Sequence, residues 1–331
     1  MFLYHGFHFR HQRRPRYLLT IETTPKPTSA DTWQRRPAPL SSSEIAARLR
    51  AVGLYCLALL LFAGIDAAAK YSSRFVPVME VVFLRYAGAM VVAFLALRPW
   101  RRPTLYRTRR PFLQLARSLF LTLSTVFNFE ALRHLQLAET TTISFAGAFL
   151  VAGLAGPMLG EWIGPRRWAA IAIGFVGVVI VTRPGPEGIQ PAVLLALGTM
   201  ICNSFYVILT RDLARTDSAE GMLLFPAITA TIALAPAALP QSVWPPSILV
   251  GVLIVTTGLL GAIGHWFLIV AHRQAPAASL APFVYFQLIW MTGLGYLVFG
   301  DLPHRLTLIG AAIIIGSGLY ILYRQRVHGD H

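Results

Sequence analysis

Charged and polar side chains interrupt long apolar runs of this sequence. In MEVVFLRYAGAMVV, residues 79–92, Glu80 and Arg85 stand among apolar residues, and Asp66 and Lys70 stand in a similar run, GIDAAAK. An ionised side chain in hydrocarbon is costly unless it meets a partner or a water-filled cavity, so such residues often mark the path of a polar solute. The chemistry indicated is therefore binding of a solute or an ion within a membrane.

The candidates for substrate binding or ion coupling share a polar side chain in or beside an apolar run. They are Asp66, Lys70, Glu80, Arg85, Arg117, Asn128, Glu130, Asn203, Tyr206, His265, Tyr285 and Gln287. On a helix, Glu80 and Arg85 would point about 140° apart. We therefore expect Arg85 to find a partner on another helix, either Asp66 or an anionic group of the substrate. Glu80 is expected nearer the outer mouth of the cavity.

Several of these candidates also have a structural interpretation that remains open. Arg85 also fits an ion pair that holds helices together, and Arg117 fits a side chain that extends to the membrane surface. Asp66 and Lys70 have the spacing of an i,i+4 ion pair. His265 titrates in a range suited to proton coupling, although a lone histidine in a membrane more often packs through a hydrogen bond.

Residues beside the candidates favour stacking or capping. Tyr285, Phe286 and Trp290 are suited to stacking on a planar or cationic substrate, and aromatic residues at this spacing are equally typical of a core. Glu139 lies where an acidic first turn caps a helix. The spans show no cluster of histidine, cysteine and carboxylate residues with metal-ligand spacing, so neither a metal nor a cofactor is expected.

The elements that carry these residues are long apolar segments. Of the 331 residues, 55% are hydrophobic and 13% are charged, against about 25% charged in a soluble domain. The expected spans are 51–70, 78–97, 112–132, 138–159, 167–183, 190–210, 220–239, 246–270, 277–299 and 306–323. A span needs roughly 20 residues to cross the hydrocarbon core. The sequence thus predicts an all-α integral membrane protein with ten transmembrane helices.

The net charge of +15 follows the connections between the spans. If the amino terminus is cytoplasmic, 13 arginines fall in cytoplasmic connections and the carboxyl tail, against five basic residues on the other side. Positive residues favour the cytoplasmic side, so both termini are expected there. The basic charge is accordingly a signal of orientation, and no nucleic acid partner is expected.

The two halves of the sequence resemble each other. A shift of 140 residues aligns 127–161 with 267–301 at seven identical positions, and Glu161 then matches Asp301. Five spans in each half place the second half in the membrane in the opposite sense. Such inverted repeats are typical of secondary transporters, with the substrate site between the halves. Duplication kept only for packing is the other interpretation.

The expected domains are a disordered basic tail (1–47), two five-helix repeats (48–186 and 187–325) and a short carboxyl tail (326–331). The amino-terminal tail is rich in arginine, proline and serine and shows no apolar periodicity, which is typical of disorder.

The most specific motif is LQLAETTTISFAGAFLVAGLAGPMLGEWIGPRRWAAIAIGFVGVVIVTRPG, residues 135–185. It resembles the EamA-type half of the drug/metabolite transporter superfamily, and the preceding spans are similar to members associated with S-adenosylmethionine uptake. The resemblance covers about residues 48–325. It implies ten helices, a central cavity that opens alternately to each side, and transport of small organic metabolites. In the second half Ser279 stands at the position of Glu139, and Asp301 replaces Glu161.

The predicted function is a secondary transporter in the bacterial inner membrane for an amino-acid-like, S-adenosylmethionine-like or drug-like metabolite. No P-loop of the form G-x-x-x-x-G-K-[ST] is present, so the transport energy is expected from protons or a counter-substrate. Asp66, Glu80 and Glu130 are the carboxylates considered for coupling. The alternatives are a lipid- or metabolite-modifying membrane enzyme and a nucleotide-sugar-type exchanger. We expect no enzymatic activity, and a homodimer is left open.

Overall fold

The described part of the chain contains ten helical segments long and apolar enough to cross a membrane. The computed structural model describes residues 42–160, 162–185, 188–275 and 277–328. Most of the expected basic tail, residues 1–41, lies outside these ranges. The prediction of an all-α membrane protein with ten transmembrane helices is confirmed.

Each half of the chain contributes five spans. The first half contains α1 (Ser42–Ser72), α2 (Val78–Leu97), α3 (Pro111–Leu132), α4 (Leu137–Phe145) with α5 (Gly147–Leu159), and α6 (Pro165–Thr182). The second half contains α7 (Pro191–Leu213), α8 (Ala219–Ala238), α9 (Ile248–Gln274), α10 (Ala277–Leu280) with α11 (Phe286–Phe299), and α12 (Arg305–His328). Three short 3₁₀ turns, Pro99–Arg101, Pro103–Tyr106 and Leu239–Gln241, lie in connections. Because each half has an odd number of spans, the second repeat is inverted relative to the first.

The fourth and ninth spans are interrupted, where the sequence predicted continuous helices. The fourth changes from α4 to α5 at Ala146, and the ninth passes through a 3₁₀ turn, Ala281–Tyr285, before α11 begins. Pro282 has no N–H to continue an α-helix, which accounts for the second interruption. The rings of Phe145 and Tyr285 meet there with centres 5.2 Å apart. These two residues are 140 positions apart, so the interruptions of the two halves face each other.

Two glycines end equivalent helices in the two halves. Gly160 follows α5 with φ 77°, and Gly300 follows α11 with φ 72°. Glycine adopts this left-handed conformation without a steric penalty and commonly terminates helices. Their spacing of 140 residues matches the repeat.

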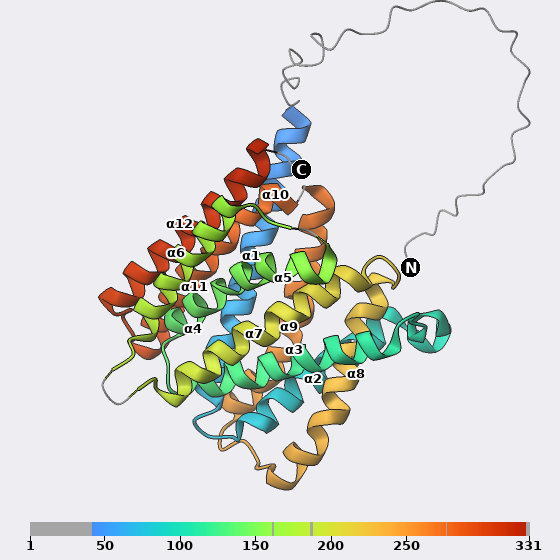
Figure 1. Cartoon of the computed structure of the whole chain (residues 1–331). Coiled ribbons are helices and arrows are strands. Elements are labelled where there is room, and N and C mark those ends of the chain that lie inside the picture. The colour runs from blue at the N-terminus through green and yellow to red at the C-terminus, as the bar shows by residue number, and fades with distance from the viewer. Residues whose placement is uncertain (1–41, 161, 186–187, 276, 329–331) are drawn as a thin grey trace, which may run out of the picture. The chain divides into compact units, whose positions relative to one another are not determined.

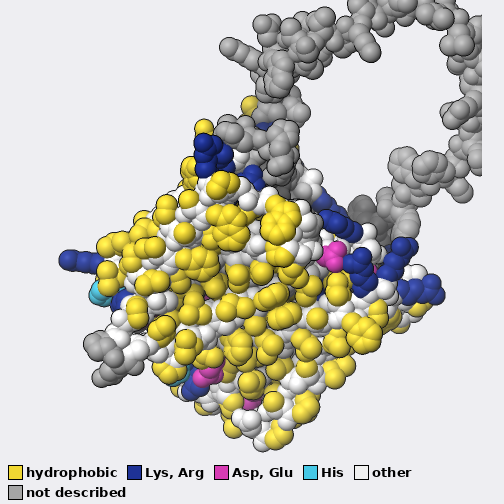
Figure 2. Space-filling model, viewed as in Figure 1, with side chains coloured by type: hydrophobic (Ala, Val, Ile, Leu, Met, Phe, Trp, Pro, Cys, Tyr) yellow, Lys and Arg dark blue, Asp and Glu magenta, His cyan; other side chains and the backbone are white. Residues whose placement is uncertain are grey.

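The outer surface of the bundle is hydrophobic. Figure 2 shows apolar side chains across the broad side of the helices, with Lys and Arg gathered at its margins. Large side chains such as Ile232, Val255 and Leu297 are 68%, 73% and 78% exposed. Such a surface is suited to contact with lipid, because the helices satisfy their own backbone hydrogen bonds.

The two membrane faces differ in basic residues. The arginine-rich face holds the α2–α3 connection, whose residues 98–110 include six arginines, together with the α5–α6, α7–α8 and α9–α10 connections. The opposite face holds the α1–α2, α3–α4, α6–α7, α8–α9 and α11–α12 connections.

Two glycines let the last spans of the halves approach closely. Helices α6 and α12 lie side by side (Figure 1). A Cβ atom on Gly310 would lie 2.7 Å from the carbonyl oxygen of Gly177, and it would also strike a methyl group of Val181. Small residues at such positions are typical of tightly packed membrane helices.

We predict that Gly310→Ala lowers the unfolding temperature of the detergent-purified protein. The added methyl group overpacks the contact with α6, which costs about 1–3 kcal/mol. Gly316→Ala is the matched control, because a Cβ on this glycine of α12 meets nothing within 4 Å. Equal unfolding temperatures for the two variants would contradict the prediction.

Candidate functional site

Three helices of the first half bring charged and polar side chains together between the spans. The Nδ2 atom of Asn128 on α3 donates a hydrogen bond of 3.1 Å to Oδ1 of Asp66 on α1. The guanidinium carbon of Arg85 on α2 lies 5.3 Å from the ring centre of Phe129 and 5.6 Å from that of Tyr86. Arg85 also interacts electrostatically with Asp66. We call Asp66, Arg85 and Asn128 the central group.

The central group lies inside the membrane. Asp66 is six residues before the end of α1, and Arg85 is seven residues after the start of α2. At 1.5 Å per residue, both lie about 9–11 Å along their helices from the opposite face. No ion pair among the described residues joins Arg85 to Asp66. A carboxylate and a guanidinium so arranged keep bonding capacity for groups of opposite charge.

The second half reaches this group through α9. The ring of His265 lies 5.0 Å from that of Phe62 on α1, and His265 interacts electrostatically with Arg85. Gly264 permits the contact, because a Cβ there would lie 2.8 Å from Cε1 of Phe62. His265 therefore lies against α1, although its own side chain is exposed.

The other candidates of the second half are dispersed. Tyr285 packs its ring on Phe145, as described above, and Gln287 on α11 has a buried Oε1 atom without a hydrogen-bond partner. The side chain of Asn203 is half-buried on α7 and makes no hydrogen bond to another described residue. Tyr206 lies on Arg117, at the arginine-rich side of the bundle.

Lys70 does not form the expected ion pair with Asp66. Its Nζ atom donates 2.8 Å to Oδ2 of Asp301 and 2.9 Å to the carbonyl oxygen of Leu135, and it lies 4.9 Å from the ring centre of Phe299. A buried ammonium group needs several acceptors. One of them, Asp301, follows the end of α11, and the residue spacing around Lys70 gives no indication of it. Lys70 thus joins the two halves at the opposite face.

Glu80 is engaged by a connection of the second half. Its Oε1 accepts 2.9 Å from the hydroxyl of Ser242, and its Oε2 accepts 2.9 Å from the N–H of Val243. Glu80 is only 4% exposed. It lies near the opposite face, and it anchors the α8–α9 connection.

Glu130 and Glu139 pair with basic residues near the opposite face. Glu130 binds Arg133 at 2.8 Å, an exposed i,i+3 pair. Glu139 lies in the first turn of α4, as expected of a capping residue, but no side chain caps that helix. Instead its Oε1 is 3.8 Å from Nη2 of Arg183.

Arg117 does not extend to the membrane surface. Its Nε donates 2.7 Å to the hydroxyl of Thr210, and both Nη atoms donate 3.1 Å to the carbonyl oxygen of Met222. It is 2% exposed and stacks on Tyr206. Arg117 therefore joins α3 to α7 and α8, because a guanidinium supplies several donors in a fixed fork.

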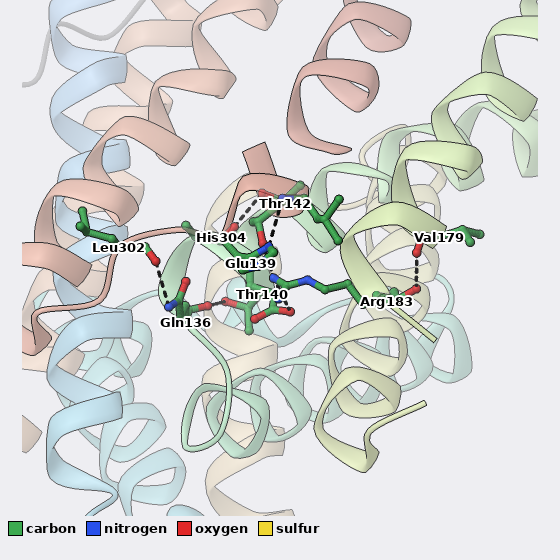
Figure 3. Close-up of polar contacts among 12 residues, drawn as sticks. Gln136, Glu139, Thr140, Thr142, Val179, Arg183, Leu302 and His304 are labelled. Carbon is green, nitrogen blue, oxygen red and sulfur yellow. Dashed lines mark hydrogen bonds and ion pairs between the residues drawn. The ribbon is translucent and has the colours of Figure 1, made fainter. Parts of the chain in front are cut away.

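A cavity at the opposite face is lined by residues that were not among the binding candidates predicted from the sequence. It has a volume of about 340 Å³ and lies among Gln136, Glu139, Arg183 and His304, which converge in Figure 3. Arg183 donates 2.7 Å to Thr307, and Gln136 donates 3.1 Å to the carbonyl oxygen of Leu302. These partners are far apart in sequence, so no spacing pattern indicates them.

The model of the EamA-like transporter family matches residues 49–183 and, a second time, residues 190–323. The chain belongs to the EamA-like transporter family. The resemblance read from residues 135–185 is thereby confirmed, as are the predictions of a transporter and of two five-helix repeats. The transporter is a multi-pass membrane protein.

Curated relatives of this transporter carry small metabolites according to their names. It is 28% identical to the S-adenosylmethionine uptake transporter of Rickettsia conorii over 84% of this chain and 94% of that protein. It is 28% identical to a riboflavin transporter of Rhizobium johnstonii, over 66% and 72% of the two chains. It is also 25% identical to a pseudopaline exporter of Pseudomonas aeruginosa, over 79% and 92%. None of these names favours the alternative of a modifying enzyme.

A solved structure is similar in fold to the transporter. It superposes with a TM-score of 0.57 at 20% identity, over 88% of this chain and all of the other. At this identity the likeness concerns the fold alone.

We predict that Glu80→Ala destabilises the purified protein, since Ser242 and Val243 lose their buried acceptor. The expected loss is about 1–3 kcal/mol, measured as a lower unfolding temperature. Glu130→Ala is the control, because an exposed ion pair is worth about 1 kcal/mol or less. An unchanged unfolding temperature for Glu80→Ala would refute the anchoring role.

Proposed function

We propose that this transporter is a secondary carrier that takes up a zwitterionic metabolite of the S-adenosylmethionine type. The central group, Asp66, Arg85 and Asn128, is the centre of its binding site. One observation carries the proposal: Asp66 and Arg85 lie within the spans, interact electrostatically, and share no direct ion pair among the described residues. Charged side chains within a span are costly unless they meet a partner or a water-filled cavity, and they often mark the path of a polar solute.

The chemistry of such a substrate complements the central group. S-adenosylmethionine carries a carboxylate, an ammonium group, a sulfonium cation and a purine ring. Arg85 is suited to bind the carboxylate through its planar fork, and Asp66 is suited to accept from the ammonium group. The faces of Tyr86 and Phe129, which already attract the guanidinium of Arg85, suit a cation such as the sulfonium. The similarity to the S-adenosylmethionine uptake transporter of Rickettsia conorii, which extends over most of both chains, supports this substrate class.

Alternating access requires contacts between the halves at each face to break in turn. At the opposite face, Lys70 binds Asp301 and Arg183 binds Thr307. At the arginine-rich face, Nη1 of Arg110 on the α2–α3 connection binds Asp212 of α7 at 2.7 Å. In the proposed cycle these contacts open on one face while those on the other hold.

Asp66 is the carboxylate proposed for coupling to protons. Both oxygens of Glu80 already accept hydrogen bonds, and Glu130 is occupied by Arg133 near the surface. Asp66 lies beside the proposed substrate groups, so its protonation would alter the charge of the site directly. Exchange against a counter-substrate is the alternative source of energy.

We propose further that the arginine-rich face is cytoplasmic and that the protein lies in a bacterial inner membrane. The support is the excess of arginine in the connections of that face, which favours cytoplasmic placement, and the bacterial origin of the relatives. Both termini would then be cytoplasmic, flanking repeats at 48–186 and 187–325.

The proposed substrate is tested by measuring uptake of labelled S-adenosylmethionine into proteoliposomes that contain the protein, under a proton gradient. The wild type should accumulate the label, recovered chemically unchanged. Asp66→Asn and Arg85→Gln should each lower uptake about tenfold or more, because each removes a charge-assisted contact with the substrate. Glu130→Gln is the matched control and should retain uptake.

Different outcomes identify different errors in this proposal. Uptake of riboflavin without uptake of S-adenosylmethionine would overturn the substrate class. Uptake that is insensitive to both central substitutions would overturn the site. A chemically altered label would instead indicate an enzyme.

The proposed orientation predicts opposite results for two reporter fusions. Alkaline phosphatase fused after residue 328 should be inactive, because it folds only outside the cytoplasm, whereas a fusion after Gln190 on the opposite face should be active. The reverse pattern would invert the orientation. Cell blots that show equal amounts of both fusions are the control.

A further inference from the structure

Two polar atoms on α11 are buried without a hydrogen-bond partner. They are Oε1 of Gln287 and Nε1 of Trp290. Among the described residues, α11 is the only helix that carries two such side chains. A buried polar atom left unpaired costs free energy, and a membrane interior supplies no solvent to pair it. This pair therefore calls for a partner of its own.

The two atoms have complementary chemistry on one side of the helix. Residues three apart on a helix are neighbours, with Cβ atoms about 5–6 Å apart. The Oε1 atom of Gln287 is an acceptor, and the Nε1–H of Trp290 is a donor. A ligand edge that presents a donor beside an acceptor would satisfy both atoms at once.

Packing places this pair beside the central group. Trp290 packs against two apolar clusters of the core, and Phe62 of α1 packs against the same two. Tyr86 and Phe129, the rings around Arg85, belong to one of these clusters. Asp66 follows Phe62 by four residues, one turn along the same side of α1. Trp290 and Asp66 therefore border one interior region, contributed by different halves.

The internal repeat shows that the fold does not require this polar pair. A shift of 140 residues places Gly147 and Leu150 at the positions of Gln287 and Trp290. Gly147 packs closely on Ser204 of α7, and Leu150 packs against an apolar cluster. The equivalent helix of the first half thus needs neither an amide nor an indole here.

We infer that Gln287 and Trp290 determine specificity by binding the edge of a planar nitrogenous ring. Gln287 Oε1 accepts from an exocyclic amine, and Trp290 Nε1–H donates to the neighbouring ring nitrogen, the pattern that a 6-aminopurine presents. The inference rests on the proposed function, in which Asp66 and Arg85 bind the charged end of the same substrate. It assigns the recognition of the ring to the second half.

The test compares competitors of labelled S-adenosylmethionine uptake in proteoliposomes. Adenosine carries the amine and the ring acceptor, whereas inosine presents the reverse pattern, an acceptor beside an N–H donor. In the wild type, adenosine should inhibit at about tenfold lower concentration than inosine. In Gln287→Leu and Trp290→Phe this preference should fall to within about twofold.

Methionine separates a specificity effect from a damaged protein, because it carries only the charged end of the substrate. Its inhibition should be unchanged in both variants. The matched controls Gln241→Leu and Trp266→Phe change exposed residues and should keep the preference for adenosine.

The outcomes separate this inference from the proposed function. If the wild type takes up S-adenosylmethionine but Gln287→Leu and Trp290→Phe keep the preference for adenosine, the assignment of the pair is overturned and the carrier stands. If the wild type takes up no S-adenosylmethionine, the proposed function fails first. In that case direct titration of the purified protein with adenosine and with inosine tests whether Gln287 and Trp290 recognise the ring. Equal affinities for the two nucleosides would overturn that role.

Discussion

The structure depends on how charged groups are accommodated in a bundle that offers them almost no water. Lys70, Glu80 and Arg117 are buried, and each makes at least two hydrogen bonds to groups distant in sequence. Leaving such a charge unpaired would cost several kcal/mol. The same contacts therefore determine which helices lie together, and they join the first half of the chain to the second at three separate places.

The charges that hold the bundle together differ from the charges that remain available to bind a solute. Both oxygens of Glu80 accept hydrogen bonds, and all three guanidinium nitrogens of Arg117 donate them, to groups of the protein itself, as expected of structural residues. Asp66 accepts a single side-chain hydrogen bond among the described residues, from Asn128, and Arg85 lies over aromatic rings. Availability of opposite charges in an aromatic surrounding is what a zwitterionic solute needs. The proposed site follows from what packing leaves unused rather than from the mere presence of polar residues.

The ten spans could be predicted from the sequence, since apolar length acts locally. The partners of the charges could not. The DAAAK spacing favoured an Asp66–Lys70 pair, whereas Lys70 binds Asp301, 231 residues away. The interruption at Ala146 was also missed, because no proline marks it and it depends on the facing helices. Local sequence patterns thus predict the helices, whereas packing between distant parts of the chain determines which candidate residues meet.

The division of the proposed site between the repeats bears on how a carrier of this kind can move. The charged end of the substrate is assigned to α1, α2 and α3, and the ring to α11, so one bound molecule would touch both halves. A ligand shifts a conformational equilibrium only by its difference in affinity between the states. A substrate that bridges the halves binds best when they close around it, so its binding favours the closed arrangement over the open one in which it entered. A site confined to one half would bind equally well in every state and would leave the equilibrium unchanged.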